Sequence, residues 1–259
     1  MRVGLFVPCY IDQLYPDVAI STLEVLEQFG VQVHFPNAQT CCGQPMANTG
    51  CADQAAPMAR RMIEIFHSFD YVVCPSGSCT AMVTHHYGHF FHTKGRDAYE
   101  KLRKKTYEFT QFVAEFLRPE RFDIPFPHRV GLHQSCHGLR ELRLGQCSER
   151  MLETRDLAGE LLSKVPGLTL VKPTRVDECC GFGGTFAVAE ADVSVAMGQS
   201  RIEDHLQAGA EVVTAGDMSC LMHLQGLLER QKQPLRVMHL AQILAGRPKD
   251  INVSTRGSS

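Results

Sequence analysis

Long apolar runs and long basic runs are both missing from this chain of 259 residues. No apolar stretch approaches the roughly 18 residues of a membrane-spanning helix, which argues against a transmembrane segment. The 26 basic and 28 acidic residues leave a formal net charge of −2 without a basic cluster, so nucleic-acid binding is not expected. The opening residues, MRVGLFVPCY, are too few for a signal peptide and are typical of a first strand. We expect a cytoplasmic protein that reaches a membrane surface only through partner proteins.

A complete dinucleotide-binding fingerprint is missing as well. Gly181 and Gly183 fit the first two glycine positions of this motif, but Phe186 stands where the third glycine belongs. Hydride transfer to a nicotinamide cofactor bound here is therefore not supported.

Cysteine, in contrast, is abundant, with 11 residues. A reducing cytosol disfavours disulfides, so metal or redox chemistry is the better explanation for so many thiols. Two of the cysteine motifs contain adjacent cysteines followed by glycine, CCGQPM beginning at Cys41 and CCGFGG beginning at Cys179. The chain thus carries the same unusual feature twice.

The two CCG motifs belong to an internal repeat. RVGLFVPC, which ends at Cys9, matches RVGLHQSC, which ends at Cys136. DYVVCPSGSC, which ends at Cys79, matches AEVVTAGDMSC, which ends at Cys220. The segment between the repeats, RPERFDIPFPH, holds three prolines and favours a linker. We predict a first repeat over residues 1–122, a second over residues 123–246, and a polar, disordered tail over residues 247–259.

Each repeat alternates strand-like and helix-like segments. Strands are expected at residues 2–7, 31–35, 71–73, 129–132, 168–171 and 211–214. Helices are expected at residues 16–28, ended by Gly30, and near residues 147–164. This alternation predicts an α/β protein of two pseudo-twofold related halves, each with a short parallel sheet.

Four cysteines of each half have a counterpart in the other half, and all follow expected strands. Because sites in open α/β sheets form at the carboxyl ends of strands, we expect two groups of four thiols. These groups are Cys9, Cys41, Cys42 and Cys79, and Cys136, Cys179, Cys180 and Cys220. Cys51, Cys74 and Cys147 have no counterpart and are interpreted as small buried apolar residues. Cys74 shares a loop with Cys79 and stays a candidate accessory ligand.

Four thiolates at one site suit either tetrahedral zinc or an iron–sulfur cluster. Within each group, however, the long spacings match neither the close cysteine pairs of zinc fingers nor the cysteine run of bacterial ferredoxins. Adjacent residues of an extended chain point to opposite sides, so two adjacent cysteines reach two irons of a cluster more readily than one small ion. The glycines that follow allow close backbone approach and N–H donation to sulfur. Segments after Cys79 and Cys220 resemble helix starts, where a thiolate is favoured.

The doubled Cys…CysCysGly…Cys pattern resembles that of the CCG-domain proteins. This cysteine-rich family includes the CCG-containing part of heterodisulfide reductase and the iron–sulfur component of glycolate oxidase, and the resemblance covers essentially the whole chain up to the tail. It implies that the eight cysteines with a counterpart in the other half bind iron–sulfur clusters, with one [4Fe–4S] cluster per half as the simplest expectation. The motifs CCGQPM, PSGSC and CCGFGG resemble in particular members that serve the oxidation of L-lactate to pyruvate. That likeness implies an electron-transfer subunit acting with two partner proteins, one of them another iron–sulfur protein.

The chain departs from the family pattern in its last motif, which is C-x-x-C in the family. Here Ser76 and Asp217 replace the first cysteine of that motif in the two halves. With four cysteines per half, the unusual five-cysteine clusters of heterodisulfide reductase are not the expectation. Ser76 and Asp217 either give an oxygen ligand to iron or cap the following helix, and we favour capping.

No catalytic residue is assigned from the sequence. His133 and His137 flank Cys136 and are candidates to donate to a cluster sulfur or to handle the proton of a 2-hydroxy acid. The histidines of HHYGHFFH are interpreted as a polar helix face, and Arg140 and Arg143 as solvated surface.

Two alternatives remain open. One is chemistry at a cluster with an open iron, as in heterodisulfide reductase or a glycolate-type 2-hydroxy-acid oxidoreductase. The other is a zinc-binding scaffold protein.

Overall fold

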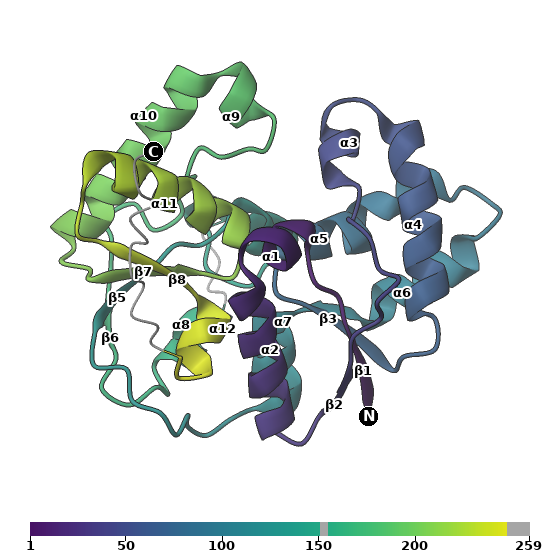
Figure 1. Cartoon of the computed structure of the whole chain (residues 1–259), viewed down its shortest axis with the longest axis horizontal. Helices are drawn as coiled ribbons and strands as arrows, with labels where there is room; N and C mark the ends of the chain where they lie inside the picture. Colours follow the sequence, from purple (N-terminus) through teal and green to yellow (C-terminus); the bar gives the residue numbers. More distant parts are fainter. Residues whose placement is uncertain (151–154, 248–259) are drawn as a thin grey trace, which may run out of the picture.

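The computed structural model describes residues 1–150 and 155–247, which form two α/β halves lying side by side (Figure 1). Of the tail predicted at residues 247–259, only Arg247 is among the described residues. Within the described ranges, the structure contains no helix that is both long and apolar enough to cross a lipid bilayer.

Each half is built on a four-stranded parallel sheet. The first sheet has the order β2-β1-β3-β4 and the second the order β6-β5-β7-β8. The strands are β1 (Arg2–Leu5), β2 (Gln32–His34), β3 (Tyr71–Cys74), β4 (Thr106–Glu108), β5 (Arg129–Leu132), β6 (Thr169–Val171), β7 (Val212–Ala215) and β8 (Arg236–His239). Equivalent residues pair in register, since Val3 pairs with Val33 in the first sheet and Val130 with Leu170 in the second. The predicted pair of pseudo-symmetric α/β halves is therefore confirmed.

The fourth strand of each sheet was not predicted. β4 has three residues and runs directly from a helix into the next helix without a glycine or proline at either end. Sequence patterns mark strands by such turn residues and by longer β-branched runs, and β4 offers neither.

The helices connect the strands and cover the sheets. Those of the first half are α1 (Cys9–Leu14), α2 (Pro16–Gln28), α3 (Gln44–Asn48), α4 (Ala52–Phe66), α5 (Gly77–Ala81), η1 (Met82–His86), η2 (Tyr87–Phe90), α6 (Arg96–Lys105), α7 (Phe109–Phe112) and η3 (Val113–Leu117). Those of the second half are η4 (His137–Glu141), η5 (Ser148–Arg150), α8 (Leu157–Leu162), α9 (Phe186–Ala189), α10 (Ala191–Gln207), α11 (Met218–Gln231) and α12 (Leu240–Leu244).

One predicted helix matches and one is corrected. α2 occupies the predicted residues, and Gly30 follows its end with a φ of 74°. The helix predicted near residues 147–164 is wrong in extent: α8 begins at Leu157 because the Asp156 carboxylate caps it, accepting from Gly159 N at 3.0 Å. Upstream of α8, η5 is only a short 3₁₀ turn, and residues 151–154 of the predicted helix lie outside the described residues.

The two halves share one hydrophobic core. α2 packs against α12 of the other half, and α7 packs against α8, so each half completes the other (Figure 1). One continuous cluster contains Val3 of the first sheet, Val130 of the second sheet, and Leu26 and Leu244 from the facing helices. Burying a side chain of this size contributes about 1.5–3 kcal/mol. The seam takes part as well, because Phe122 lies in the same cluster.

Candidate metal centre

The two halves meet at the loops that follow β3 and β7. Ser76 and Asp217 form an antiparallel bridge, and Gly77 N donates to Gly216 O at 3.3 Å. These loops lie at the carboxyl ends of the strands, so the two sheets direct their strand ends toward a common centre. The helices that follow the CCG motifs, α3 and α9, lie at the upper edge of the view in Figure 1.

The first group of cysteines comes together at the end of the first sheet. Cys9 opens α1, Cys41 and Cys42 follow β2, and Cys79 lies in α5. The Sγ atoms of Cys9 and Cys41 are 3.7 Å apart, and those of Cys42 and Cys79 are 3.4 Å apart. Gly43 N donates to the Cys41 sulfur at 3.4 Å.

The second group repeats this arrangement. Cys179 interacts with Cys136 and with Cys180, which in turn interacts with Cys220. Gly181 N donates to the Cys179 sulfur at 3.3 Å, as Gly43 does in the first group. The structure therefore brings the eight cysteines that correspond between the repeats into two groups of four.

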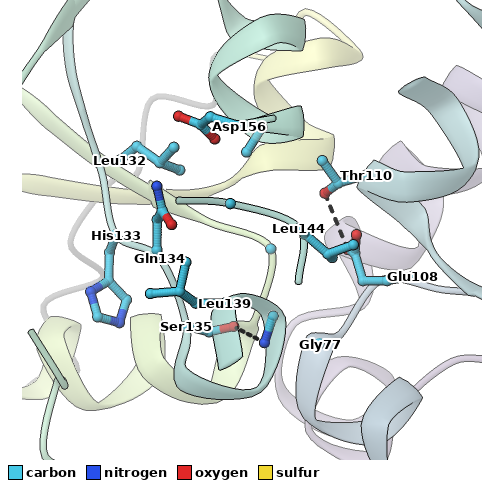
Figure 2. A pocket seen from close by; sticks show the side chains of 14 residues that line it. Gly77, Glu108, Thr110, Leu132, His133, Gln134, Ser135, Leu139, Leu144 and Asp156 are labelled. Carbon is cyan, nitrogen blue, oxygen red and sulfur yellow. Dashed lines mark hydrogen bonds between the residues drawn. The ribbon is translucent and has the colours of Figure 1, made fainter. Parts of the chain in front are cut away.

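Both groups line one cavity of about 330 Å³. Its polar lining residues include Gln44, Ser76, Ser78, His137, Asp217 and Ser219, and its apolar and aromatic ones include Tyr10, Phe182, Val188 and Met218. The sequence predicted two groups, and the structure adds that they face a shared space. A second cavity of about 40 Å³, lined by Glu108, His133 and Asp156 among others, is large enough for only a few waters (Figure 2).

Within each group, the first cysteine of the CCG motif has a lowered pKa and is the thiol that ionises most readily. Hydrogen bonds from Cys42 and Cys9, with a further one from Gly43 N, lower the pKa of Cys41 to about 2. Hydrogen bonds from Cys136, Cys180 and Gly181 N likewise lower the pKa of Cys179 to about 2. The pKa of Cys9 is raised by its bond to Cys41 and by burial. Four close thiols with a backbone donor fit the ligand set of an iron–sulfur cluster or of tetrahedral zinc.

The three cysteines without counterparts lie elsewhere. Cys74 is the last residue of β3 and not part of the loop that leads to Cys79; it is fully buried in an apolar cluster and does not line the cavity. Cys147 is buried, with its sulfur 3.2 Å from a carboxylate oxygen of Glu149. Cys51 is exposed at the start of α4, so its interpretation as a buried apolar residue is wrong.

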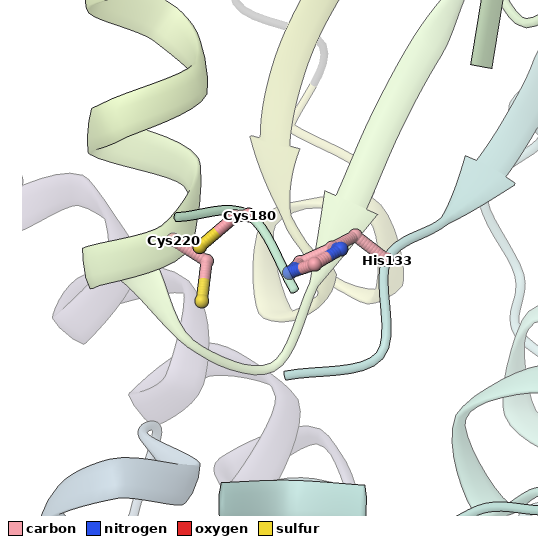
Figure 3. Close-up of side chains that lie close together, drawn as sticks. All are labelled: His133, Cys180 and Cys220. Atoms are coloured by element: carbon pink, nitrogen blue, oxygen red, sulfur yellow. The ribbon is translucent and has the colours of Figure 1, made fainter. Parts of the chain in front are cut away.

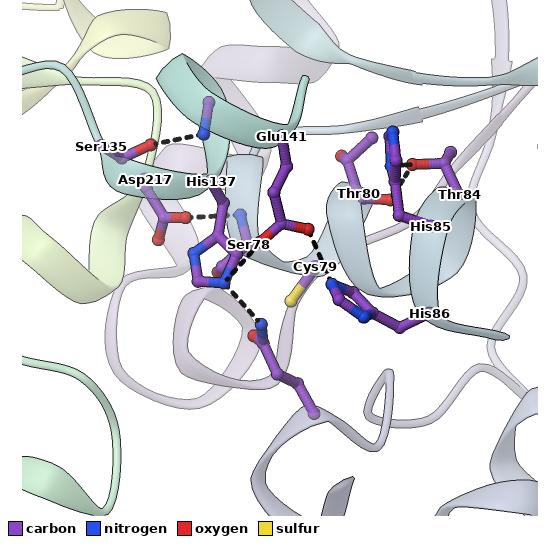
Figure 4. A network of polar contacts seen from close by, with 12 residues as sticks. Ser78, Cys79, Thr80, Thr84, His85, His86, Ser135, His137, Glu141 and Asp217 are labelled. Carbon is purple, nitrogen blue, oxygen red and sulfur yellow. Dashed lines mark hydrogen bonds and ion pairs between the residues drawn. The ribbon is translucent and has the colours of Figure 1, made fainter. Parts of the chain in front are cut away.

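Ser76 and Asp217 both have helix-capping geometry. Ser76 Oγ accepts from Cys79 N at 3.2 Å, and Asp217 Oδ1 accepts from Ser219 N at 3.1 Å. Asp217 Oδ2 also reaches the other half, where it accepts from Ser78 N at 2.7 Å (Figure 4). One carboxylate thereby holds the first turns of α5 and α11 together.

His137 lies on the cavity wall within a polar network (Figure 4). Its Nε2 is 3.2 Å from the Gln44 side-chain nitrogen and 3.6 Å from Glu141 Oε1, and Glu141 Oε2 is 2.6 Å from His86 Nε2. His86 is thus part of this network and not only of a solvated face. The cavity itself is lined by none of the histidines of HHYGHFFH.

The two arginines after Cys136 do not serve the cavity. Arg140 forms a two-atom contact with Glu149, its Nη2 lying 2.7 Å from Oε1, and Arg143 is exposed.

Two aromatic residues of the site were missed by the sequence reasoning. Tyr10 and Phe182 cross the boundary between the halves with ring centroids 6.2 Å apart. Their repeat counterparts, His137 and Gln44, form the polar contact described above, so equivalent walls of the cavity differ in polarity. The repeat alignment could have revealed this, because all four residues directly follow a Cys or CysGly position.

Comparison with known proteins agrees with this construction. A family model described as a cysteine-rich domain, CCG, matches residues 3–84 and 130–225. A lactate utilization protein A of Exiguobacterium sp. (strain ATCC BAA-1283 / AT1b) is 42% identical over 247 residues, covering 94% of this chain and 96% of the relative. One from Bacillus thuringiensis (strain Al Hakam) is 38% identical over 249 residues, covering 95% and 100%.

Among solved structures, a hypothetical protein from Helicobacter pylori superposes with a TM-score of 0.66 at 11% identity. The match covers 96% of this chain and 49% of that protein, and at this identity it supports the fold alone.

Proposed function

Because the chain belongs to the cysteine-rich CCG family, we propose that it is an iron–sulfur subunit of a multi-protein system that oxidises L-lactate to pyruvate. The names of its relatives, lactate utilization protein A, support the substrate. In this proposal the chain acts with two partner proteins, one of them also an iron–sulfur protein, and carries electrons rather than binding a nicotinamide.

The observation that carries the proposal is the meeting of eight thiols in two groups of four around one cavity. One group, with Cys41 and Cys42 at its centre, would hold one [4Fe–4S] cluster, and its counterpart with Cys179 and Cys180 would hold the second. Each cluster would supply one-electron redox chemistry. Oxidation of lactate to pyruvate releases two electrons and two protons, so two such clusters match the electron count.

Metal analysis of anaerobically prepared protein tests the cofactor. We expect roughly eight irons and eight acid-labile sulfides per chain, falling to about four in Cys179→Ser and in Cys41→Ser, because each four-cysteine site holds one cluster. Cys51→Ser is the matched control, since Cys51 is exposed and outside both groups. Zinc without sulfide would overturn the proposal and leave the scaffold alternative.

Lactate dependence is tested by spectroscopy with and without the proteins that copurify with the tagged chain. We expect L-lactate to bleach the cluster absorption only when those partners are present. Unchanged absorption with the complete set of partners would contradict the electron-carrier role.

A second candidate, chemistry on a small molecule inside the cavity, is favoured by the unequal cavity walls. The polar pair His137 and Gln44 faces the same space as the aromatic pair Tyr10 and Phe182. Bleaching of the isolated chain by lactate would support this candidate, as would recovery of the cluster absorption when a small disulfide oxidises the chemically reduced isolated chain.

A further inference from the structure

Three basic side chains are buried beneath the second four-cysteine site. His133 is 1% exposed, and Arg201 and His205 are 0% exposed. Burying such groups is costly unless they are paired, and folding alone gives no reason for three of them in one place. The only acid paired with Arg201 among the described residues is Asp204, at 2.9 Å.

The first half has apolar residues at the equivalent positions. Phe6 aligns with His133 in the repeat, three residues before the first cysteine. Phe66 occupies the space next to Gly4 that His205 occupies next to Gly131.

Four residues earlier on the same helices stand Met62 and Arg201. Phe6, Met62 and Phe66 belong to one hydrophobic cluster. The second half therefore has three basic residues at the positions where the first half has three apolar ones.

Arg201 determines which nitrogen of His133 carries the proton. Arg201 Nε lies 3.3 Å from His133 Nδ1. A guanidinium can only donate hydrogen bonds, so Nδ1 must be the acceptor, and the hydrogen of the neutral ring is on Nε2. Within the described part of the chain, His133 Nε2 is buried and has no hydrogen-bond partner.

The unpartnered edge of the ring faces sulfur. A ring nitrogen of His133 and the Sγ atoms of Cys180 and Cys220 all lie within 4.8 Å of one another (Figure 3). Since Arg201 occupies Nδ1, the nitrogen available to these sulfurs is Nε2 with its hydrogen. A nitrogen that carries hydrogen has no free lone pair for a metal, so the ring is a donor and not a ligand.

We propose that His133 is a positioning residue that donates an Nε2–H hydrogen bond to a ligand sulfur of the second site and thereby raises the reduction potential of the cluster held there above that of the first site. The inference rests on the proposed function. Hydrogen bonds to cluster sulfur stabilise the additional negative charge of the reduced state, which makes reduction easier. Phe6 provides no such donor, so the two sites differ and electrons collect at the second.

The test is an anaerobic redox titration followed by EPR on proteins that keep one site each. Cys41→Ser keeps the second site and Cys179→Ser keeps the first. In the Cys41→Ser protein, H133N should shift the midpoint potential downward, because asparagine can still accept from Arg201 but has no donor at the Nε2 position. H133Q places an amide donor there and should stay near the parent value.

The same H133N change in the Cys179→Ser protein is the matched control and should not shift the potential of the first site. An unchanged potential of the second site in H133N would overturn the inference. So would loss of its iron with the fold retained, which would identify His133 as a ligand.

Where H133N is not stable, H133F combined with R201M imports the apolar pair of the first half and should give the same downward shift. Asp204 still accepts from Thr174 N and Arg175 N in that variant. An unshifted potential in the double variant would again overturn the inference. Parent proteins that contain zinc and no sulfide would instead overturn the proposed function on which the inference rests.

Discussion

At the scale of single residues, the glycine after each cysteine pair has a defined task. Gly43 and Gly181 adopt φ values of 83° and 87°, a region that other residues rarely enter. This conformation turns the glycine N–H back toward the sulfur of the first cysteine. Space is limited too, since a Cβ at Gly181 would lie 2.6 Å from Ser194 O.

Gly181→Ala should therefore damage the second site selectively. We expect a loss of about 3 kcal/mol from backbone strain and overpacking, and iron reduced to about half. Gly184→Ala is the control, because Gly184 also has a positive φ, 67°, but has nothing within 4 Å of the added carbon. It should cost only about 1 kcal/mol and keep all the iron. Iron analysis measures the occupancy of the sites, and urea denaturation measures the loss of stability. Equal iron contents in the two variants would contradict this account.

At the scale of elements, the helix that follows the fourth strand is capped by an acidic residue in the first half and by a histidine in the second. Glu108 caps α7, where its Oε2 accepts from Gln111 N at 3.2 Å, and His239 caps α12, where its Nδ1 accepts from Ala241 N at 3.1 Å. Burial raises the pKa of Glu108 to about 8 and lowers the pKa of His239 to about 4. Both caps are thus uncharged near neutral pH, which lets both helices start in the interior.

Glu108→Gln should remove part of the pH dependence of stability. Below the unfolded pKa of about 4.5, the folded and unfolded states both hold the Glu108 proton; between that value and about 8 only the folded state does. Stability of the native chain should therefore fall as pH rises through this window, by at most about 1.4 kcal/mol per pH unit. In urea denaturation, the free energy of unfolding of the variant should equal that of the native chain near pH 5 and be larger at pH 8. Glu120 is exposed, so Glu120→Gln should leave the dependence of the free energy of unfolding on pH unchanged. The same unchanged dependence in Glu108→Gln would show that Glu108 is not a buried neutral acid.

The elements also show where sequence reasoning stops. α2 was predictable because its apolar stripe and its terminal glycine are both local signals. α8 was predicted too long because its start depends on the Asp156 cap. β4 was missed because a three-residue strand between two helices carries no periodic pattern.

At the scale of the whole molecule, the repeat does not produce two independent domains. The proline-rich seam predicted as a linker buries Phe122 and Phe126 in the shared core, and the Phe29 and Phe122 rings lie 6.1 Å apart. α2 and α12 face each other across the boundary. We expect the two halves to unfold together.

Leu26→Ala, on α2, should destabilise both halves equally. The expected loss is about 2–5 kcal/mol, because Leu26 is fully buried. Hydrogen exchange of β3 and β7 amides should accelerate by the same factor. Leu14→Ala is the control, since Leu14 is 59% exposed, and it should change stability by less than about 0.5 kcal/mol. Faster exchange confined to β3 would contradict a single folding unit.

The sequence by itself determined which eight cysteines are paired between the halves, the α/β alternation and the strand ends at which those cysteines lie. These features depend on local periodicity and on repetition, and both are visible in one chain. Only the tertiary structure decided that the two groups share a cavity, that Asp217 caps two helices, and that His133 faces Cys180 and Cys220. Such contacts depend on how side chains from distant segments pack, including around the pseudo-twofold axis, and packing of this kind leaves no periodic signal in the order of residues.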